Sequence, residues 1–164
     1  MRRTGFWLKT FALVLSLLWQ GDTIAQARAP LLDQIDGVIE TLRHTPPASR
    51  EQDRLHDTLL GLIDKLAPGD ADEKLVGALI SLLDESTHRD LVALCLFRFS
   101  RQPVAHKAVP RLLEVLPEED CIGPAVRTGV WASYTIRYLL KDMGVGGRDW
   151  PSEKVSCPPR TTDR

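Results

Sequence analysis

Long hydrophobic runs are almost absent from this sequence. The one sustained run, from Phe11 to Trp19, is about half of the ~20 residues that a transmembrane helix needs, so an uncleaved membrane anchor is the weaker alternative. The run follows a basic N-terminus and precedes a polar stretch that ends in Ala25-Gln26-Ala27, which is the three-part pattern of a secretory signal peptide. We therefore predict that residues 1–27 are a cleaved signal peptide. The remaining chain is predicted to be periplasmic or secreted, with no integral membrane segment.

A strong excess of charge of one sign is also missing. The 164 residues include 21 Lys and Arg and 22 Asp and Glu, for a formal net charge of −1. Removal of residues 1–27 takes away three cations and one anion, which leaves a net charge of −3 on one domain's length of chain. Residues 28–85 carry 6 cations and 12 anions, whereas residues 86–164 carry 12 and 9. This second half is far less basic than a nucleic-acid-binding surface, so we predict no nucleic-acid partner.

The motifs of catalytic and metal sites are missing as well. No two of the four histidines lie four residues apart and no HExxH motif occurs, so we interpret the histidines as surface residues. No serine lies in a GxSxG motif. The glycine-rich stretch 144–147 follows a predicted helix instead of preceding one, so it is not placed to cradle a phosphate. We predict no catalytic, metal-binding or cofactor-binding residues and no enzyme activity; the alternative is a cell-envelope enzyme whose site is assembled only in the fold.

Cysteines are few, and there are three of them. Cys95 lies within the most apolar segment, which predicts a buried thiol. Cys121 and Cys157 lie outside the predicted core helices, and an exported chain folds where disulfides form, so we predict a disulfide between them. In the chain-entropy model such a bond would stabilise the fold by about 3–4 kcal/mol. The alternative is a pair of unbonded thiols.

Apolar residues, by contrast, are plentiful and recur at helical spacing in nearly every segment, and no segment alternates convincingly as a strand. The continuous apolar run 91–97 could also be a buried strand, but Thr87 is placed to cap a helix and no partner strand exists elsewhere. A helix that is apolar on nearly every side belongs in the middle of a stack. The pattern predicts an all-α fold with six helices, over residues 31–43, 50–66, 71–85, 87–100, 104–116 and 124–143.

A weak internal repeat is also present. A shift of 33 residues aligns 75–85 with 108–118, and six of the eleven aligned positions are apolar in both segments. A period of this length with two helices per unit is typical of α-solenoids. Val109-Pro110-Arg111-Leu112-Leu113 and Val126-Arg127 resemble the first and second helices of HEAT repeats, and the stretch 140–150 resembles the ending of short bacterial HEAT-like proteins.

The resemblance covers about residues 71–150. It implies a short HEAT-like right-handed α-solenoid of about three helical hairpins over residues 28–143, followed by a C-terminal tail over residues 144–164. An irregular helical bundle is the alternative. The first predicted helix pair, 31–66, fits a helical hairpin without the HEAT motifs.

The last predicted helix carries aromatic and basic residues at helical spacing: Arg127, Trp131, Tyr134, Arg137, Tyr138 and Lys141. Because the terminal helix of a solenoid has one uncovered side, these six residues are candidates for a partner-binding patch. The alternative is that the tail, led by Trp150, folds over them.

HEAT-like stacks typically bind proteins, so the resemblance implies an exported, non-catalytic interaction module for an unidentified protein partner. A more specific form is an immunity or inhibitor protein for an envelope-acting enzyme. The alternatives are the envelope enzyme named above and a structural subunit of an envelope complex.

Overall fold

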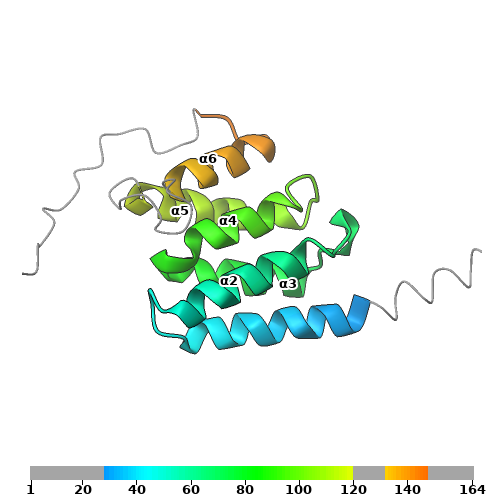
Figure 1. Ribbon diagram of the computed structural model, residues 1–164. Helices are drawn as coiled ribbons and strands as arrows, with labels where there is room; N and C mark the ends of the chain where they lie inside the picture. The colour runs from blue at the N-terminus through cyan, green and yellow to red at the C-terminus, as the bar shows by residue number, and fades with distance from the viewer. Residues whose placement is uncertain (1–27, 120–131, 148–164) are drawn as a thin grey trace, which may run out of the picture.

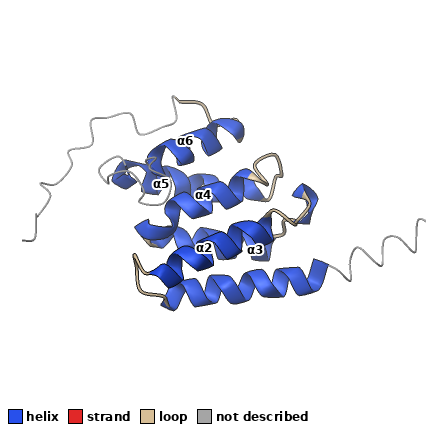
Figure 2. Ribbon diagram, viewed as in Figure 1, coloured by secondary structure: helices blue, strands red, loops and turns tan. Residues whose placement is uncertain are grey.

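The computed structural model describes residues 28–119 and 132–147. Figure 2 shows that these residues form helices joined by short turns, and no strand occurs among them. The predicted all-α fold is therefore confirmed. Several predictions fall outside the described residues and stay predictions: the signal peptide, the Cys121–Cys157 disulfide, and the positions of Arg127, Trp131 and Trp150.

The helices lie close to the predicted ranges, but most are shorter. They are the N-terminal helix (28–44), α2 (Arg50–Ile63), α3 (Glu73–Ser81), α4 (Arg89–Phe97), α5 (Val109–Glu119) and α6 (Ala132–Asp142). Tight 3₁₀ turns replace predicted α-helix at Leu82–Asp84, Ser86–His88 and Ala105–Ala108. The predicted start of the sixth helix, 124–131, lies outside the described residues.

Polar side chains fix where α2 and α3 begin. The hydroxyl of Ser49 accepts a hydrogen bond from the backbone N–H of Gln52, and the carboxylate of Asp72 accepts one from the first turn of α3. These caps satisfy N–H groups that have no partner inside the helix. The predicted cap of α4 is wrong, because Thr87 lies in a 3₁₀ turn and the helix begins after His88 with no side-chain cap.

The helices form two layers (Figure 1). The first layer holds the N-terminal helix, α3 and α5, and polar side chains link each helix to the next. The links are Lys74 with Asp36, Arg43 with Ser81 (2.6 Å), Lys107 with Glu73 (2.6 Å) and Arg111 with Asp84 (2.6 Å). The residue numbers of the linked positions rise together: Asp36 and then Arg43 of the N-terminal helix contact Lys74 and then Ser81 of α3. The helices of the first layer therefore run parallel.

The second layer holds α2, α4 and α6, and its links follow the same order. They are His56 with His88 (3.0 Å), Arg98 with the carbonyl of Leu66 (3.2 Å), Thr135 with Asp90 (2.7 Å), and Ser100 with Asp142. These helices also run parallel to one another. Each helix of the first layer is followed in the chain by one of the second layer, so three helical hairpins lie side by side.

The hydrophobic core lies between the two layers, and α4 is at its centre. Five of its apolar side chains are buried: Leu91, Val92, Ala93, Cys95 and Leu96. The predictions of a central fourth helix and of a buried Cys95 are confirmed. The helix is not buried on every side, however, because Leu94 and Phe97 are exposed. Among the described residues, no helix combines the length and the hydrophobicity that crossing a membrane requires.

Candidate protein-interaction face

In the part of the chain that the structure describes, all the exposed large hydrophobic side chains lie on two neighbouring helices. Among the described residues they are Leu94 (37% exposed) and Phe97 (46%) of α4, and Tyr134 (54%) and Tyr138 (66%) of α6. We refer to these four side chains as the α4–α6 face. A single exposed apolar residue is ordinary, but a group of them on adjacent elements is typical of an interaction site.

Helix periodicity and the packing of α6 beside α4 bring the four side chains together. Leu94 and Phe97 are three residues apart, and Tyr134 and Tyr138 are four apart, so each pair shares one side of its helix. The bond from Thr135 to Asp90 sets α6 beside α4 in parallel. Leu94 lies four residues beyond Asp90, and Tyr138 lies three beyond Thr135, so the two side chains lie at about the same height along the helices.

Basic residues surround this face. Residues 91–104 and 132–147 contain four cations, Arg98, Arg101, Arg137 and Lys141, but one acid, Asp142. Asp142 accepts a hydrogen bond from the hydroxyl of Ser100. The sequence around the α4–α6 face is therefore cationic, and it has the aromatic and arginine composition that is enriched in protein interfaces.

A shallow pocket lies at one end of the face, where α4 ends. It has a volume of about 270 Å³, and Phe97 and Arg101 help to line it, together with Pro68 and Asp142. Small-molecule sites have volumes of about 300–1,000 Å³. The pocket is therefore at the lower end of the size range of small-molecule sites, and it is large enough for one side chain of a partner.

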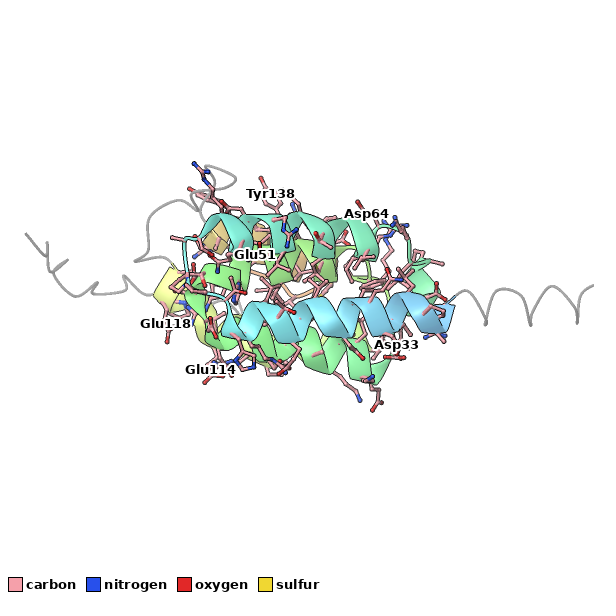
Figure 3. The ribbon with its side chains drawn as sticks, turned by 60° about the horizontal axis from the view of Figure 1, so that its bottom comes forward. Asp33, Glu51, Asp64, Glu114, Glu118 and Tyr138 are labelled. Atoms are coloured by element: carbon pink, nitrogen blue, oxygen red, sulfur yellow. The ribbon has the colours of Figure 1, made fainter. Side chains whose placement is uncertain are left out.

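The outer surface of the first layer has a different character. Its exposed charges pair across neighbouring helices, as in Lys107 with Glu73 and Arg111 with Asp84, both at 2.6 Å. Figure 3 shows Asp33 and Glu114 pointing outward into solvent on this side of the molecule, whereas Tyr138 and Asp64 point outward on the opposite side. Surface pairs of this kind are typical of a solvated face. The second layer is therefore the better candidate for binding.

The predicted patch residues agree in part with this face. Tyr134, Tyr138 and Lys141 are exposed and Arg137 is half-buried, all on α6, while Arg127 and Trp131 lie outside the described residues. Sequence reasoning missed Leu94 and Phe97 of α4. They fall within a continuous apolar run, so nothing in the pattern separated the exposed positions from the buried ones.

A buried ion-pair network lies beside the start of α4. The guanidinium group of Arg89 donates to the carbonyl of Leu83 (2.8 Å) and to the carboxylate of Glu119 (2.8 Å), and it lies 2.7 Å from a carboxylate oxygen of Glu118. Arg89 is 5% exposed and Glu119 is 2% exposed. Burial raises the pKa of Glu119, and the charge of Arg89 opposes that rise. The network joins α4 to the end of α5 and is structural in character.

A buried histidine pair lies between α2 and α4. His56 Nε2 and His88 Nδ1 are 3.0 Å apart, and Gln52 Nε2 lies 3.5 Å from the same His88 atom. On its other side, His88 Nε2 lies 3.3 Å from a carboxylate oxygen of Glu85. The interpretation of all four histidines as surface residues is therefore wrong for His56 and His88, because both are buried. Their separation of 32 residues gave no local signal of this contact.

The histidine pair predicts a loss of stability in mild acid. Burial lowers the pKa of His88, and the charge of Glu85 opposes that effect. Below pH about 6.5, the usual pKa of histidine, the unfolded chain binds a proton that folded His88 resists, so the free energy of unfolding falls as pH decreases. One such group changes it by at most about 1.4 kcal/mol per pH unit. Urea unfolding between about pH 8 and pH 5 measures the slope.

Two substitutions test the source of that slope. His88→Asn is expected to flatten it, whereas His44→Asn, at an exposed histidine of the N-terminal helix, is expected to leave it unchanged. An unchanged slope in His88→Asn would contradict the assignment. Glu119, whose pKa is raised, acts in the opposite direction, because stability falls as pH rises above about 4.5 through its folded pKa. Since Glu119 is present in all three proteins, the comparison isolates His88.

Metal binding finds no support in the part of the chain that is described. Within residues 28–119 and 132–147, no group of three or more His, Cys, Asp or Glu side chains is placed to hold a metal ion. The prediction that the protein uses no metal or cofactor stays a prediction.

No protein-family model, no curated protein and no solved structure matches this chain.

Proposed function

We propose that this chain is an exported, non-catalytic protein-interaction module that binds a protein partner through the α4–α6 face. One observation carries the proposal: among the described residues, every exposed large hydrophobic side chain lies on these two adjacent helices. Leaving such side chains in water is unfavourable, and binding would remove them from it at about 25 cal/mol per Å². The cationic surroundings and the adjoining pocket support the same use.

The proposal includes a HEAT-like stack as the scaffold. It is supported by the parallel order of the helices within each layer, which the links between successive helices show. The weak internal repeat supports it too, because a 33-residue shift aligns 75–85 with 108–118. In such a stack, parallel second-layer helices form a continuous surface, which is the usual binding surface of helical solenoids.

Export from the cytoplasm and an inhibitory role complete the proposal. Export is supported by the three-part pattern of residues 1–27. The specific role that we propose is that of an immunity or inhibitor protein, which binds an envelope-acting enzyme. A small exported module that presents an exposed apolar face is suited to covering another protein's site.

Variants of the α4–α6 face test the proposal. The chain is cross-linked in its native envelope and captured, and co-purifying proteins are identified by mass spectrometry. We expect one stoichiometric partner with the unmodified chain, and at least a tenfold loss of it, about 1.4 kcal/mol or more, with Tyr134→Ala/Tyr138→Ala. The matched control is Asp33→Ala/Glu114→Ala on the first layer, which is expected to retain the partner. Equal recovery with both variants would contradict the assignment of the face.

A further inference from the structure

We infer that the segment that occupies the α4–α6 face is an acidic peptide segment of a partner protein, with an apolar side chain that enters the pocket beside Phe97. This inference rests on the proposed function and adds the chemistry of the partner. It follows from charge, from pocket geometry and from the contrast between the two layers.

The charge argument begins with the cations at the end of the face. Arg101 and Lys141 are exposed, and neither forms an ion pair with any described residue. Lys141 lies three residues beyond Tyr138, and Arg101 shares the pocket lining with Phe97, so each cation adjoins an apolar side chain of the face. In the first layer, by contrast, Lys74, Lys107 and Arg111 all have acidic partners on neighbouring helices. Among the described residues, no acid neutralises Arg101 or Lys141, so these two cations can pair with a partner's carboxylates.

The opposite charge on α2 limits where an acidic segment can lie. Asp53 and Asp57 are exposed on that helix, and Asp64 is exposed directly after its end. Asp64 points from the same side of the molecule as Tyr138 (Figure 3). Like charges in close contact are unfavourable across an interface, so carboxylates of the partner are directed away from α2 and towards α4 and α6.

The pocket supplies the anchor point. Phe97, which is nearly half exposed, and Phe99, which is fully buried, both line it. Arg98 is held in place by hydrogen bonds to the carbonyl of Leu66 (3.2 Å) and more weakly to that of Asp64 (3.5 Å). The pocket has an apolar wall, two adjacent cations and one carboxylate, that of Asp142, which already accepts a hydrogen bond from Ser100. It therefore suits an apolar side chain that has a carboxylate close to it in sequence.

A second copy of the chain is a poorer occupant for this face. A symmetric dimer through the α4–α6 face would place two cationic surfaces opposite each other. Repulsion between them would oppose the gain from apolar burial. The chain's own segment 148–164 has four cations and three acids, so it does not supply the negative charge that the face favours.

The test is selection of a random peptide library, displayed on phage, against the full-length chain. We expect the enriched peptides to share acidic residues around an aromatic or aliphatic residue. Arg101→Glu/Lys141→Glu is expected to weaken their binding by roughly tenfold or more, and raising the salt from about 0.05 M to about 0.5 M is expected to weaken it further. The matched control Lys74→Glu/Lys107→Glu makes the same charge change on the first layer and is expected to retain binding.

The outcomes separate this inference from the proposed function. Neutral or basic peptides that lose binding in Phe97→Ser/Tyr138→Ser would overturn the acidic chemistry and leave the face intact. Selection of no peptide that depends on the face would overturn both. A chain ending at Gly147 that binds the acidic peptides at least ten times more tightly than the full chain would identify the chain's own tail as the occupant and overturn the inference. Concentration-dependent dimerisation that is lost in the Phe97→Ser/Tyr138→Ser variant would identify a second copy and overturn it too.

Discussion

Replacement of Arg89 by methionine is expected to destabilise the fold by about 3–5 kcal/mol, because it leaves the carboxylate of Glu119 buried without its partner. A domain of this size has a total stability of about 5–15 kcal/mol, so the variant should be close to unfolding. The Leu83 carbonyl also loses its donor, which adds to the cost. Chemical denaturation of the two proteins at pH 7 measures the difference.

Two controls show whether the buried charge causes the loss. Arg89→Met/Glu119→Met removes both charges and is expected to recover at least about 2 kcal/mol relative to Arg89→Met alone. Arg111→Met removes the ion pairs of a partly exposed arginine with two exposed acids, Asp84 and Glu114. It is expected to lower the free energy of unfolding by about 1 kcal/mol or less. An Arg89→Met variant no less stable than Arg111→Met would contradict the prediction.

The pH dependence of the Arg89→Met variant gives a further check. Burial already raises the pKa of Glu119, and removal of the opposing Arg89 charge should raise it more. Between pH about 4.5 and the folded pKa, folded Glu119 binds a proton that the unfolded chain releases, so stability falls as pH rises. The deficit of the variant should therefore be larger at neutral pH than in mild acid. A deficit independent of pH would indicate lost packing instead of an unpaired charge.

Helix positions followed from the sequence because local physics decides them. Apolar residues at helical spacing in 50–66 correctly located α2, and the caps Ser49 and Asp72 fit the observed starts of α2 and α3. The 3₁₀ turns were missed, since Leu82–Asp84 and Ala105–Ala108 carry the same apolar spacing as the helices that they adjoin. Helix ends of this kind depend on packing against other elements, which the local pattern does not encode.

Sequence analysis identified only those residues of the candidate site whose spacing along a single helix places them together. Tyr134 and Tyr138 were identified because their spacing on α6 is visible in the sequence. Leu94 and Phe97 were not, because their exposure depends on which side of α4 faces α2 and α6. The buried pairs were missed for a related reason: Arg89 and Glu119 are 30 residues apart, so their contact exists only after the hairpins stack.

Phe97 and Phe99 provide a matched test of core and face within one short segment. Phe99 is fully buried, and Phe99→Ala is expected to cost about 3–5 kcal/mol of stability from lost burial and the cavity left behind. Phe97 is nearly half exposed, so Phe97→Ala should change stability by about 1 kcal/mol or less. The two substitutions remove the same atoms, and denaturant unfolding compares them directly.

The two substitutions should affect partner binding in the opposite order: Phe97→Ala should weaken it more than Phe99→Ala does. Under conditions where both variants remain folded, Phe97→Ala is expected to weaken capture of the partner by roughly tenfold or more, because it removes one wall of the pocket. Phe99→Ala should retain most of the binding per folded molecule, since its side chain is fully buried and presents no surface to a partner. If Phe99→Ala lost binding while folded and Phe97→Ala did not, the exposed Phe97 ring would not contribute to binding. Phe97 would then have to be removed from the α4–α6 face.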